Sequence, residues 1–152
     1  RIGLLAGRFS PQGNEARYNG YFDALARQGL KADPRYVLDI DPTLEAGEEA
    51  MARLLEMEER PTAVFCTNDT VAAGAMKAVI RAGLRIPKDM AVVGFDDSSV
   101  SRIVEPELTT VRIDMDQMGR LAAEKLFDLI DGRPLDRKKI VIPTELIVRK
   151  SS

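Results

Sequence analysis

Three polar residues stand where they could form one binding site. Arg17 falls in the first turn of an expected helix that follows an apolar strand, and Asn68 and Asp96 each follow the end of a further apolar strand. The carboxyl ends of parallel strands meet at one edge of an open α/β sheet, where ligands bind. A carboxylate accepts hydrogen bonds from paired hydroxyls, an amide donates and accepts, and a guanidinium donates. The set suits a neutral polyol.

Each of these residues could instead serve the structure alone. Asp96 or Asp97 could cap the turn that follows, Asn68 could brace a loop, and Arg17 could pair with a nearby carboxylate on its own helix. Placement in the sequence leaves both interpretations open.

A rival chemistry is suggested by the segment Asp39-Ile-Asp-Pro-Thr-Leu44, which matches the DxDxTL pattern of haloacid-dehalogenase-like phosphatases. Asp39 would be the nucleophile and Asp41 the acid/base, with Thr67 and the Asp96-Asp97 pair at the later phosphate and Mg²⁺ positions. The pattern is short, however, and it lies on the second expected strand, where that family has it on the first. We therefore favour a helix N-terminus at this segment.

Composition excludes several other site types. The chain has no histidine, which removes Ser-His-Asp and Cys-His catalysis and His-ligated zinc. The glycine-rich signatures for nucleotide phosphates and dinucleotides are missing, so no cofactor is expected. Cys66 is the only cysteine and ends an apolar run, which is typical of a small buried hydrophobe. The net charge of −2 argues against nucleic-acid binding by the chain as a whole, and no apolar run approaches a membrane span.

Apolar runs alternate with helical patterns along most of the chain, which predicts an α/β fold with a parallel sheet and helices on both faces. The second helix is expected to be capped by Thr43 or Asp41, and the third by Asp69. Small residues in the third helix should allow close packing on the sheet. The expected strands are 2–6, 36–40, 63–66 and 90–95. The first expected helix spans about 14–28, the second starts near 44, and the third spans 70–82.

The pattern changes in the last third. Residues 105–113 form an expected extended crossover, and residues 115–130 an expected helix whose apolar surface needs cover on more than one side. Two short terminal strands, 139–142 and 145–148, are expected on either side of Pro143.

Together these segments resemble the C-terminal half of the effector-binding domain of LacI/GalR-family transcriptional regulators, and the resemblance spans almost the entire chain. It implies a type I periplasmic-binding-protein-like lobe formed by residues 1–107 and 137–152, with 108–136 crossing to the N-terminal lobe. Because Arg1 opens an apparent strand, we expect an N-terminal part to be absent, and the resemblance implies that this part includes a helix-turn-helix DNA-binding domain. The segments are Arg17-Tyr-Asn-Gly-Tyr-Phe-Asp-Ala-Leu25, Arg60-Pro-Thr-Ala-Val-Phe-Cys-Thr-Asn-Asp69, Val71-Ala-Ala-Gly74, Gly83-Leu-Arg-Ile-Pro87, Val92-Val-Gly-Phe-Asp-Asp97, Pro106-Glu-Leu-Thr-Thr-Val111, Gly119 and Leu146-Ile-Val-Arg-Lys-Ser151.

The resemblance also implies a function. The protein would be a cytoplasmic homodimer and not an enzyme, would bind a sugar or possibly a nucleobase, and would reach operator DNA only through the missing helix-turn-helix domain, with no membrane contact. An exported sugar-binding protein of a transport system is the alternative, which the ending 146–151 disfavours. The family's effector contacts fall on Arg17, Asn68 and Asp96, with weaker matches at Phe65, Gly13 and Asn14.

Overall fold

A parallel four-stranded sheet forms the centre of the molecule. The computed structural model describes residues 1–7, 11–134 and 139–152, with the side chains of 11–14 excepted. The strand order is β2-β1-β3-β4, and all three pairs of neighbours are parallel. The strands are β1 (Ile2–Gly7), β2 (Val37–Ile40), β3 (Ala63–Cys66) and β4 (Ala91–Val93).

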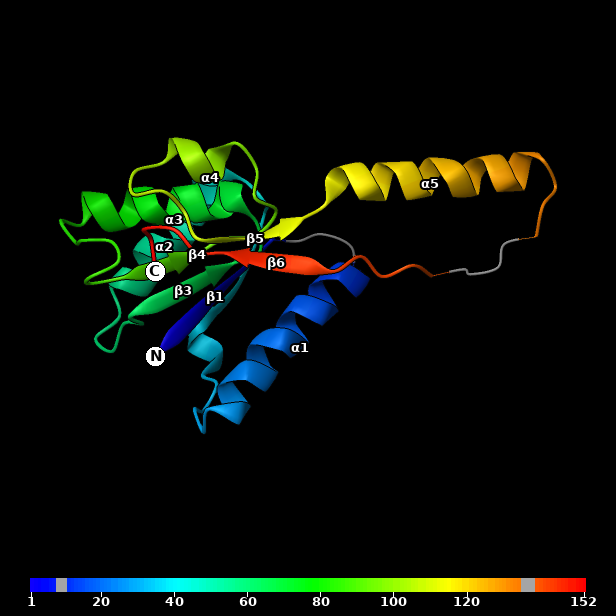
Figure 1. Cartoon of the computed structure of the whole chain (residues 1–152). Helices are drawn as coiled ribbons and strands as arrows, with labels where there is room; N and C mark the ends of the chain where they lie inside the picture. Colours follow the sequence, from blue (N-terminus) through cyan, green and yellow to red (C-terminus); the bar gives the residue numbers. More distant parts are fainter. Residues whose placement is uncertain (8–10, 135–138) are drawn as a thin grey trace.

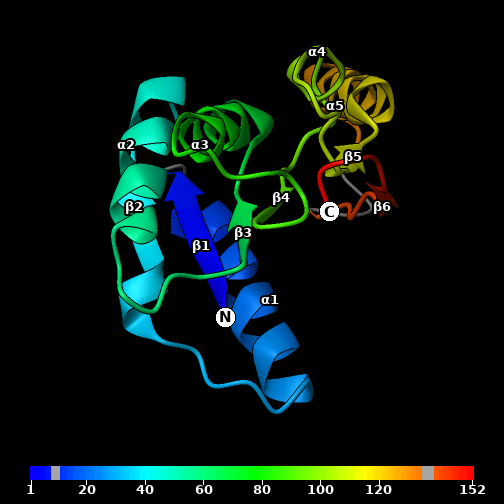
Figure 2. The same ribbon diagram turned by 90° about the vertical axis from the view of Figure 1, so that its left-hand side faces the viewer.

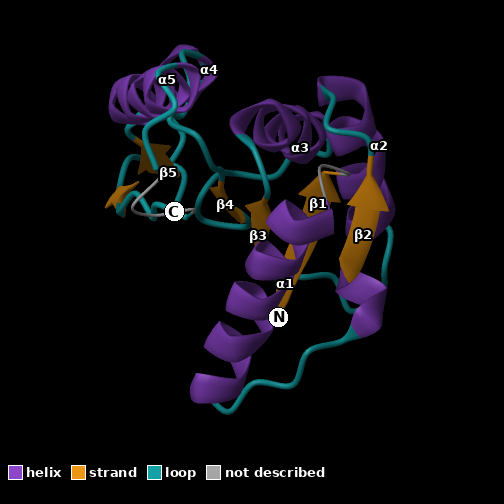
Figure 3. Ribbon diagram, turned by 90° about the vertical axis from the view of Figure 1, so that its right-hand side faces the viewer, coloured by secondary structure: helices purple, strands orange, loops and turns teal. Residues whose placement is uncertain are grey.

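Helices cover both faces of this sheet, as the sequence predicted. α1 (Pro11–Arg27) lies on one face, and α2 (Leu44–Leu55) and α3 (Asp69–Arg81) lie side by side on the other (Figures 2 and 3). Successive side chains of a strand point to opposite faces, so β1 serves both layers. Leu4 and Ala6 pack with Tyr21 and Leu25 on the α1 side, while Leu5 joins the larger α2–α3 core. Burial from both sides explains the unbroken apolar run of this strand.

Two glycines let α2 and α3 approach each other backbone to backbone. A Cβ added to Gly74 would lie 2.0 Å from the carbonyl oxygen of Leu44, and one added to Gly47 would lie 2.4 Å from that of Val71. The expectation that small residues of the third helix serve packing on the sheet is therefore wrong for Gly74, whose missing side chain makes room for a neighbouring helix.

Several element boundaries differ from the expected ones. α1 begins at Pro11, so Arg17 lies in its second turn instead of its first. The cap of α3 is Asn68, whose Oδ1 accepts a hydrogen bond from the Val71 N–H at 2.7 Å, and not Asp69. The cap of α2 is Thr43, one of the two expected residues. A 3-10 turn, Pro34–Tyr36, precedes β2.

The last third forms an arm. After the short helix α4 (Val100–Ile103), β5 (Thr110–Ile113) leads out to α5 (Met115–Ile130), and β6 (Thr144–Ile147) returns beside β5 as its antiparallel partner. Figure 1 shows α5 projecting away from the sheet, and none of its residues is buried. The helix has its expected bounds. The expected strand 139–142 is absent. β5 ends at Ile113, which pairs with Thr144, so no residue of β5 remains opposite 139–142.

The end of the chain is fixed to the sheet beside β4. The Ser151 hydroxyl donates to the Val92 carbonyl oxygen at 2.6 Å and accepts from the Thr109 N–H at 2.8 Å, and Ser151 is fully buried. Bridges between Val93 and Thr109 and between Asp96 and Arg112 continue the sheet along the same side. No helix within the described ranges has the length and apolar character needed to span a bilayer.

Candidate ligand-binding edge of the sheet

The carboxyl ends of β1, β3 and β4 lie together at one edge. Pairing in register places Leu5 opposite Cys66, and just beyond them the Gly7 N–H donates to Thr67 Oγ1 at 2.6 Å. Asn68 and Asp96 follow the ends of β3 and β4 at this edge, as predicted from their positions in the sequence.

Arg17 and Asp96 lie close enough for their charges to interact. The Arg17 guanidinium carbon lies 4.6 Å from the centre of the Phe95 ring, a cation–π distance. Partial burial raises the pKa of Asp96, while the positive charge of Arg17 opposes this shift and the negative charge of Asp69 adds to it. Asp96 also has φ 104°, which residues other than glycine seldom adopt. Such strain is concentrated at functional sites.

Asn68 has a structural role that limits what it can offer a ligand. Its Oδ1 is used as the cap of α3, and its side chain is almost buried. Within the described ranges its amide NH2 makes no hydrogen bond. The Asn68 Oδ1 atom is thus engaged by the helix, and the amide NH2 is the group that remains to donate to a ligand.

Phe65 contributes to an apolar groove between α1 and the sheet. The groove has a volume of about 560 Å³. Gly13 and Asn14 fall in the first turn of α1, but their side chains lie outside the described part of the chain. The groove is lined by Ile2, Tyr21, Leu25, Phe65, Phe95 and Arg17, among others.

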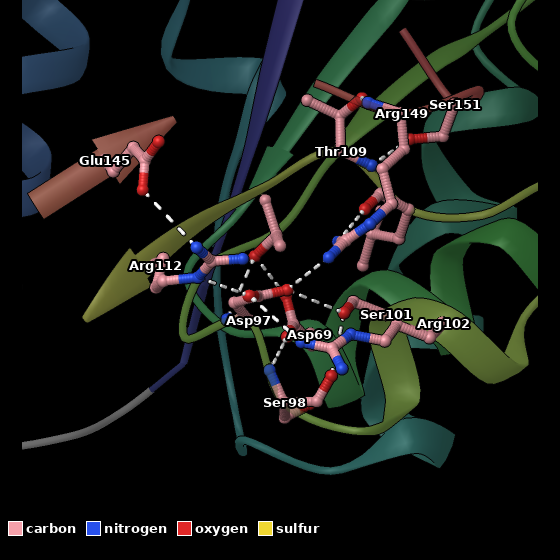
Figure 4. A network of polar contacts seen from close by, with 12 residues as sticks. Asp69, Asp97, Ser98, Ser101, Arg102, Thr109, Arg112, Glu145, Arg149 and Ser151 are labelled. Carbon is pink, nitrogen blue, oxygen red and sulfur yellow. Dashed lines mark hydrogen bonds and ion pairs between the residues drawn. The ribbon is translucent and has the colours of Figure 1, made fainter. Parts of the chain in front are cut away.

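Asp97 is the residue whose importance the sequence concealed. Its side chain is only 3% exposed and accepts from Arg149 Nη2 at 2.5 Å, Arg112 Nε at 2.8 Å and Ser101 Oγ at 3.1 Å. Figure 4 shows these groups converging on its carboxylate, with Arg102 nearby at 3.6 Å. Burial by itself would raise the pKa of Asp97, but the hydrogen bonds from the two arginines and the serine outweigh it and lower the pKa to about 2.

Asp69 holds the loop after β4 through a second set of hydrogen bonds. Its carboxylate accepts from the Thr110 hydroxyl at 2.5 Å and from the Ser98 N–H at 2.7 Å, and it is buried. A Cβ at Gly94 would lie 2.5 Å from Asp69 Oδ1, so this approach needs glycine. Asp69, which the sequence predicted to cap this helix, instead links α3 to the segment that follows β4.

The phosphatase arrangement does not form. Tyr18 donates to Asp39, Thr43 caps α2, and Thr67 accepts from the Gly7 N–H. β2, which carries Asp39, is separated from β4 by β1 and β3, so Asp39 lies far along the sheet from Asp96. No cluster of candidate metal ligands occurs among the residues that the structure describes.

Cys66 is fully buried, as expected for a small hydrophobe. Burial, reinforced by the negative charge of Asp69, raises the pKa of its thiol. A protonated, enclosed thiol is a poor nucleophile.

The sequence as a whole matches the model of one protein family. The family is described as the periplasmic binding protein-like domain, and the match covers residues 1–152. Relatives include the transcriptional repressor PurR of Pasteurella multocida, 37% identical over 99% of this chain, and the repressor CytR of Escherichia coli, 38% identical over 100%. The regulator GalR of Escherichia coli is 42% identical over 99%. The chain spans 44–45% of the length of these three relatives.

Solved structures agree with these relatives. The regulator CelR in complex with cellobiose superposes with a TM-score of 0.94 at 36% identity, covering 100% of this chain and 46% of that one. A LacI-family regulatory protein from Chloroflexus aggregans gives a TM-score of 0.91 at 35% identity, covering 99% and 54%. These relatives are regulators of transcription and not transport proteins or phosphatases.

Proposed function

Because the chain belongs to the family of periplasmic binding protein-like domains, we propose that it is the effector-binding and dimerisation part of a LacI-type transcriptional repressor. Its effector is a small molecule of the sugar class. The observation that carries this proposal is the Arg17 guanidinium lying over the Phe95 ring at the carboxyl edge of the sheet, close enough for its charge to act on Asp96.

The chemistry of this edge suits a sugar. The Asp96 carboxylate accepts hydrogen bonds from hydroxyls, while the Arg17 guanidinium and the Asn68 amide NH2 donate them. Phe65 and Phe95 add apolar ring surface beside these groups. The bound cellobiose of the CelR structure, a relative at 36% identity, supports a sugar over a nucleobase. Gly13 and Asn14 remain proposed contacts on the strength of the family resemblance.

The arm is proposed to belong to a second lobe. The sequence places this crossing at residues 108–136 and the return to the lobe described here at 137–152, and the burial of the first residues moves its start. α5 supports this division because it buries none of its residues and exposes Met115, Leu126, Phe127 and Ile130. An amphipathic helix needs an apolar partner. Leu108, Thr109 and Thr110 are buried against the present lobe, so we place the departure after Thr110.

The mechanism requires no bond chemistry, and the protein is proposed not to be an enzyme. A ligand held between two lobes favours the lobe orientation to which it binds better. That preference changes the geometry of the dimer, and with it the affinity of two DNA-reading heads for a two-fold operator. The DNA-reading heads would be helix-turn-helix domains outside this chain, and such a regulator works in the cytoplasm.

The dimer face is proposed to lie on α3 and α4. A groove there is lined by Leu44, Met76, Ile80 and Val104, with charged residues at its margin. Ile80 is 53% exposed and Ile103 is 79% exposed. Exposed aliphatic side chains gathered beside a groove are typical of an interaction surface.

Calorimetry tests the binding site. Cellobiose and a panel of other sugars and nucleobases are titrated into the full-length protein and into its Asp96→Ala variant. The variant should lose binding of whichever compound the parent binds, because the hydroxyl acceptor is gone. Asp89→Ala is the control, since Asp89 pairs with Arg85 on the same lobe away from the proposed site. Parent-like affinity in the Asp96→Ala variant would refute the site.

A further inference from the structure

Asp97 joins the segments at which the arm leaves and re-enters the lobe. Its carboxylate contacts Ser101 and Arg102 of α4, Arg112 of β5, and Arg149 of the segment after β6. These partners lie up to 52 residues away in the sequence. One buried carboxylate therefore connects β5 and the segment after β6 to the loop after β4 (Figure 4).

The arginines extend this connection to the backbone of the lobe and to the second strand. Arg149 Nη1 donates to the Leu108 carbonyl oxygen at 2.8 Å, and the Arg149 N–H donates to Thr109 Oγ1 at 2.9 Å. Arg112 also contacts Glu145 of β6 at 3.4 Å. If the Asp97 carboxylate lost its charge, Arg149, which is 11% exposed, would be left with a poorly compensated charge.

The proposed ligand contact is the next residue in the chain. Asp96 and Asp97 have φ values of 104° and 50°, so the chain turns sharply at this dipeptide. The Asp96 N–H donates to the Val111 carbonyl oxygen of β5 at 2.8 Å. A displacement of the Asp96 backbone therefore acts directly on the strand that leaves the lobe.

We propose that Asp97, held by Arg149 and Arg112, is the hinge clamp that sets the direction in which β5 and β6 leave the lobe. Through it, a ligand bound at Asp96 biases the orientation of the second lobe. Asp97 is thus a positioning residue that does not touch the ligand. This inference builds on the proposed function, because it assumes that α5 belongs to a second lobe and that Asp96 contacts an effector.

The test measures the separation of the two lobes without a ligand. Spin labels are attached to the full-length protein at Glu58→Cys on this lobe and Glu124→Cys on α5, both of which are exposed, whereas the native Cys66 is buried. The distance distribution is then recorded by pulsed electron resonance. Asp97→Asn, which keeps the shape of the side chain and removes its charge, should broaden or shift the distribution. Asp89→Asn, the matched neutralisation of an ion-paired carboxylate remote from the arm, should leave it unchanged.

A second variant covers the case in which Asp97→Asn does not fold. Arg112→Gln removes one of the two charged hydrogen bonds at a residue that is 44% exposed, and it should broaden the distribution to a smaller degree. A parent-like distribution in folded Asp97→Asn, or in Arg112→Gln where Asp97→Asn is unfolded, overturns the clamp. Equal broadening in Asp89→Asn overturns it too. Failure of the parent to bind any compound in the calorimetric panel is a separate result, which counts against the proposed function and not against the clamp.

Discussion

Replacing Gly74 by alanine should destabilise the protein strongly, although alanine is the better helix former. The new Cβ would lie 2.0 Å from the Leu44 carbonyl oxygen and 2.8 Å from the Glu48 backbone nitrogen, both parts of the α2 backbone that cannot rotate away. Ordinary contact would need a separation increased by roughly 1.4 Å, so α2 and α3 must move apart. Overpacking of this kind costs about 1–3 kcal/mol, and occasionally more. The gain in helix propensity of about 0.5–1 kcal/mol offsets only part of this cost.

The same substitution at Gly20 serves as the control. Gly20 lies within α1, and a Cβ there meets no atom within 4 Å. Alanine should therefore stabilise the chain by about 0.5–1 kcal/mol. Both variants are made in the 152-residue chain and unfolded with urea while the helical circular dichroism is followed. Opposite shifts of the midpoint are expected. A Gly74→Ala variant as stable as the parent would refute the close helix crossing.

Three further predictions follow from the polar contacts and the exposed face. The folded protein holds the pKa of Asp97 at about 2, below the ordinary value of 3.8. The charged carboxylate therefore stabilises the fold above about pH 4, and about 2 kcal/mol of stability is lost as the pH falls towards 2. Urea unfolding at several acidic pH values should show this decline, and Asp97→Asn should flatten it. Asn68→Ala should cost about 1 kcal/mol of stability through the lost cap of α3, while Asn68→Ser should retain most of it; equal losses in the two variants would argue against a capping role. Ile80→Lys should reduce dimerisation of the full-length protein in sedimentation without a change in helical content, and an unchanged dimer would move the interface away from α3.

Elements with a clear local signal were predictable. The run from Ile2 is apolar because β1 is buried on both faces, and α5 has its expected bounds because its apolar stripe is unbroken between Asp114, which caps it, and Gly132. The order of strand ends was enough to place Asn68 and Asp96 at one edge, since parallel strands share a direction.

Other errors arise because distant contacts decide the role of a residue. Asn68 and Asp69 are both good caps, and the choice is made by Thr110 and Ser98, which occupy the Asp69 carboxylate from distant parts of the chain. The structural role of Asp97 could not be recognised from the sequence either, because distant residues determine it. Its partners Arg112 and Arg149 lie 15 and 52 residues further along, and no local pattern relates them.

The antiparallel pairing of β5 with β6 constrains how α5 can move. Cross-strand hydrogen bonds over Thr110–Ile113 and Thr144–Ile147 make the two connections a single ribbon. Such a ribbon shears and stretches far less readily than it flexes out of its own plane. The lobe that α5 is proposed to join should therefore tilt about the plane of this ribbon, so that a small displacement at its base becomes a larger movement at its far end.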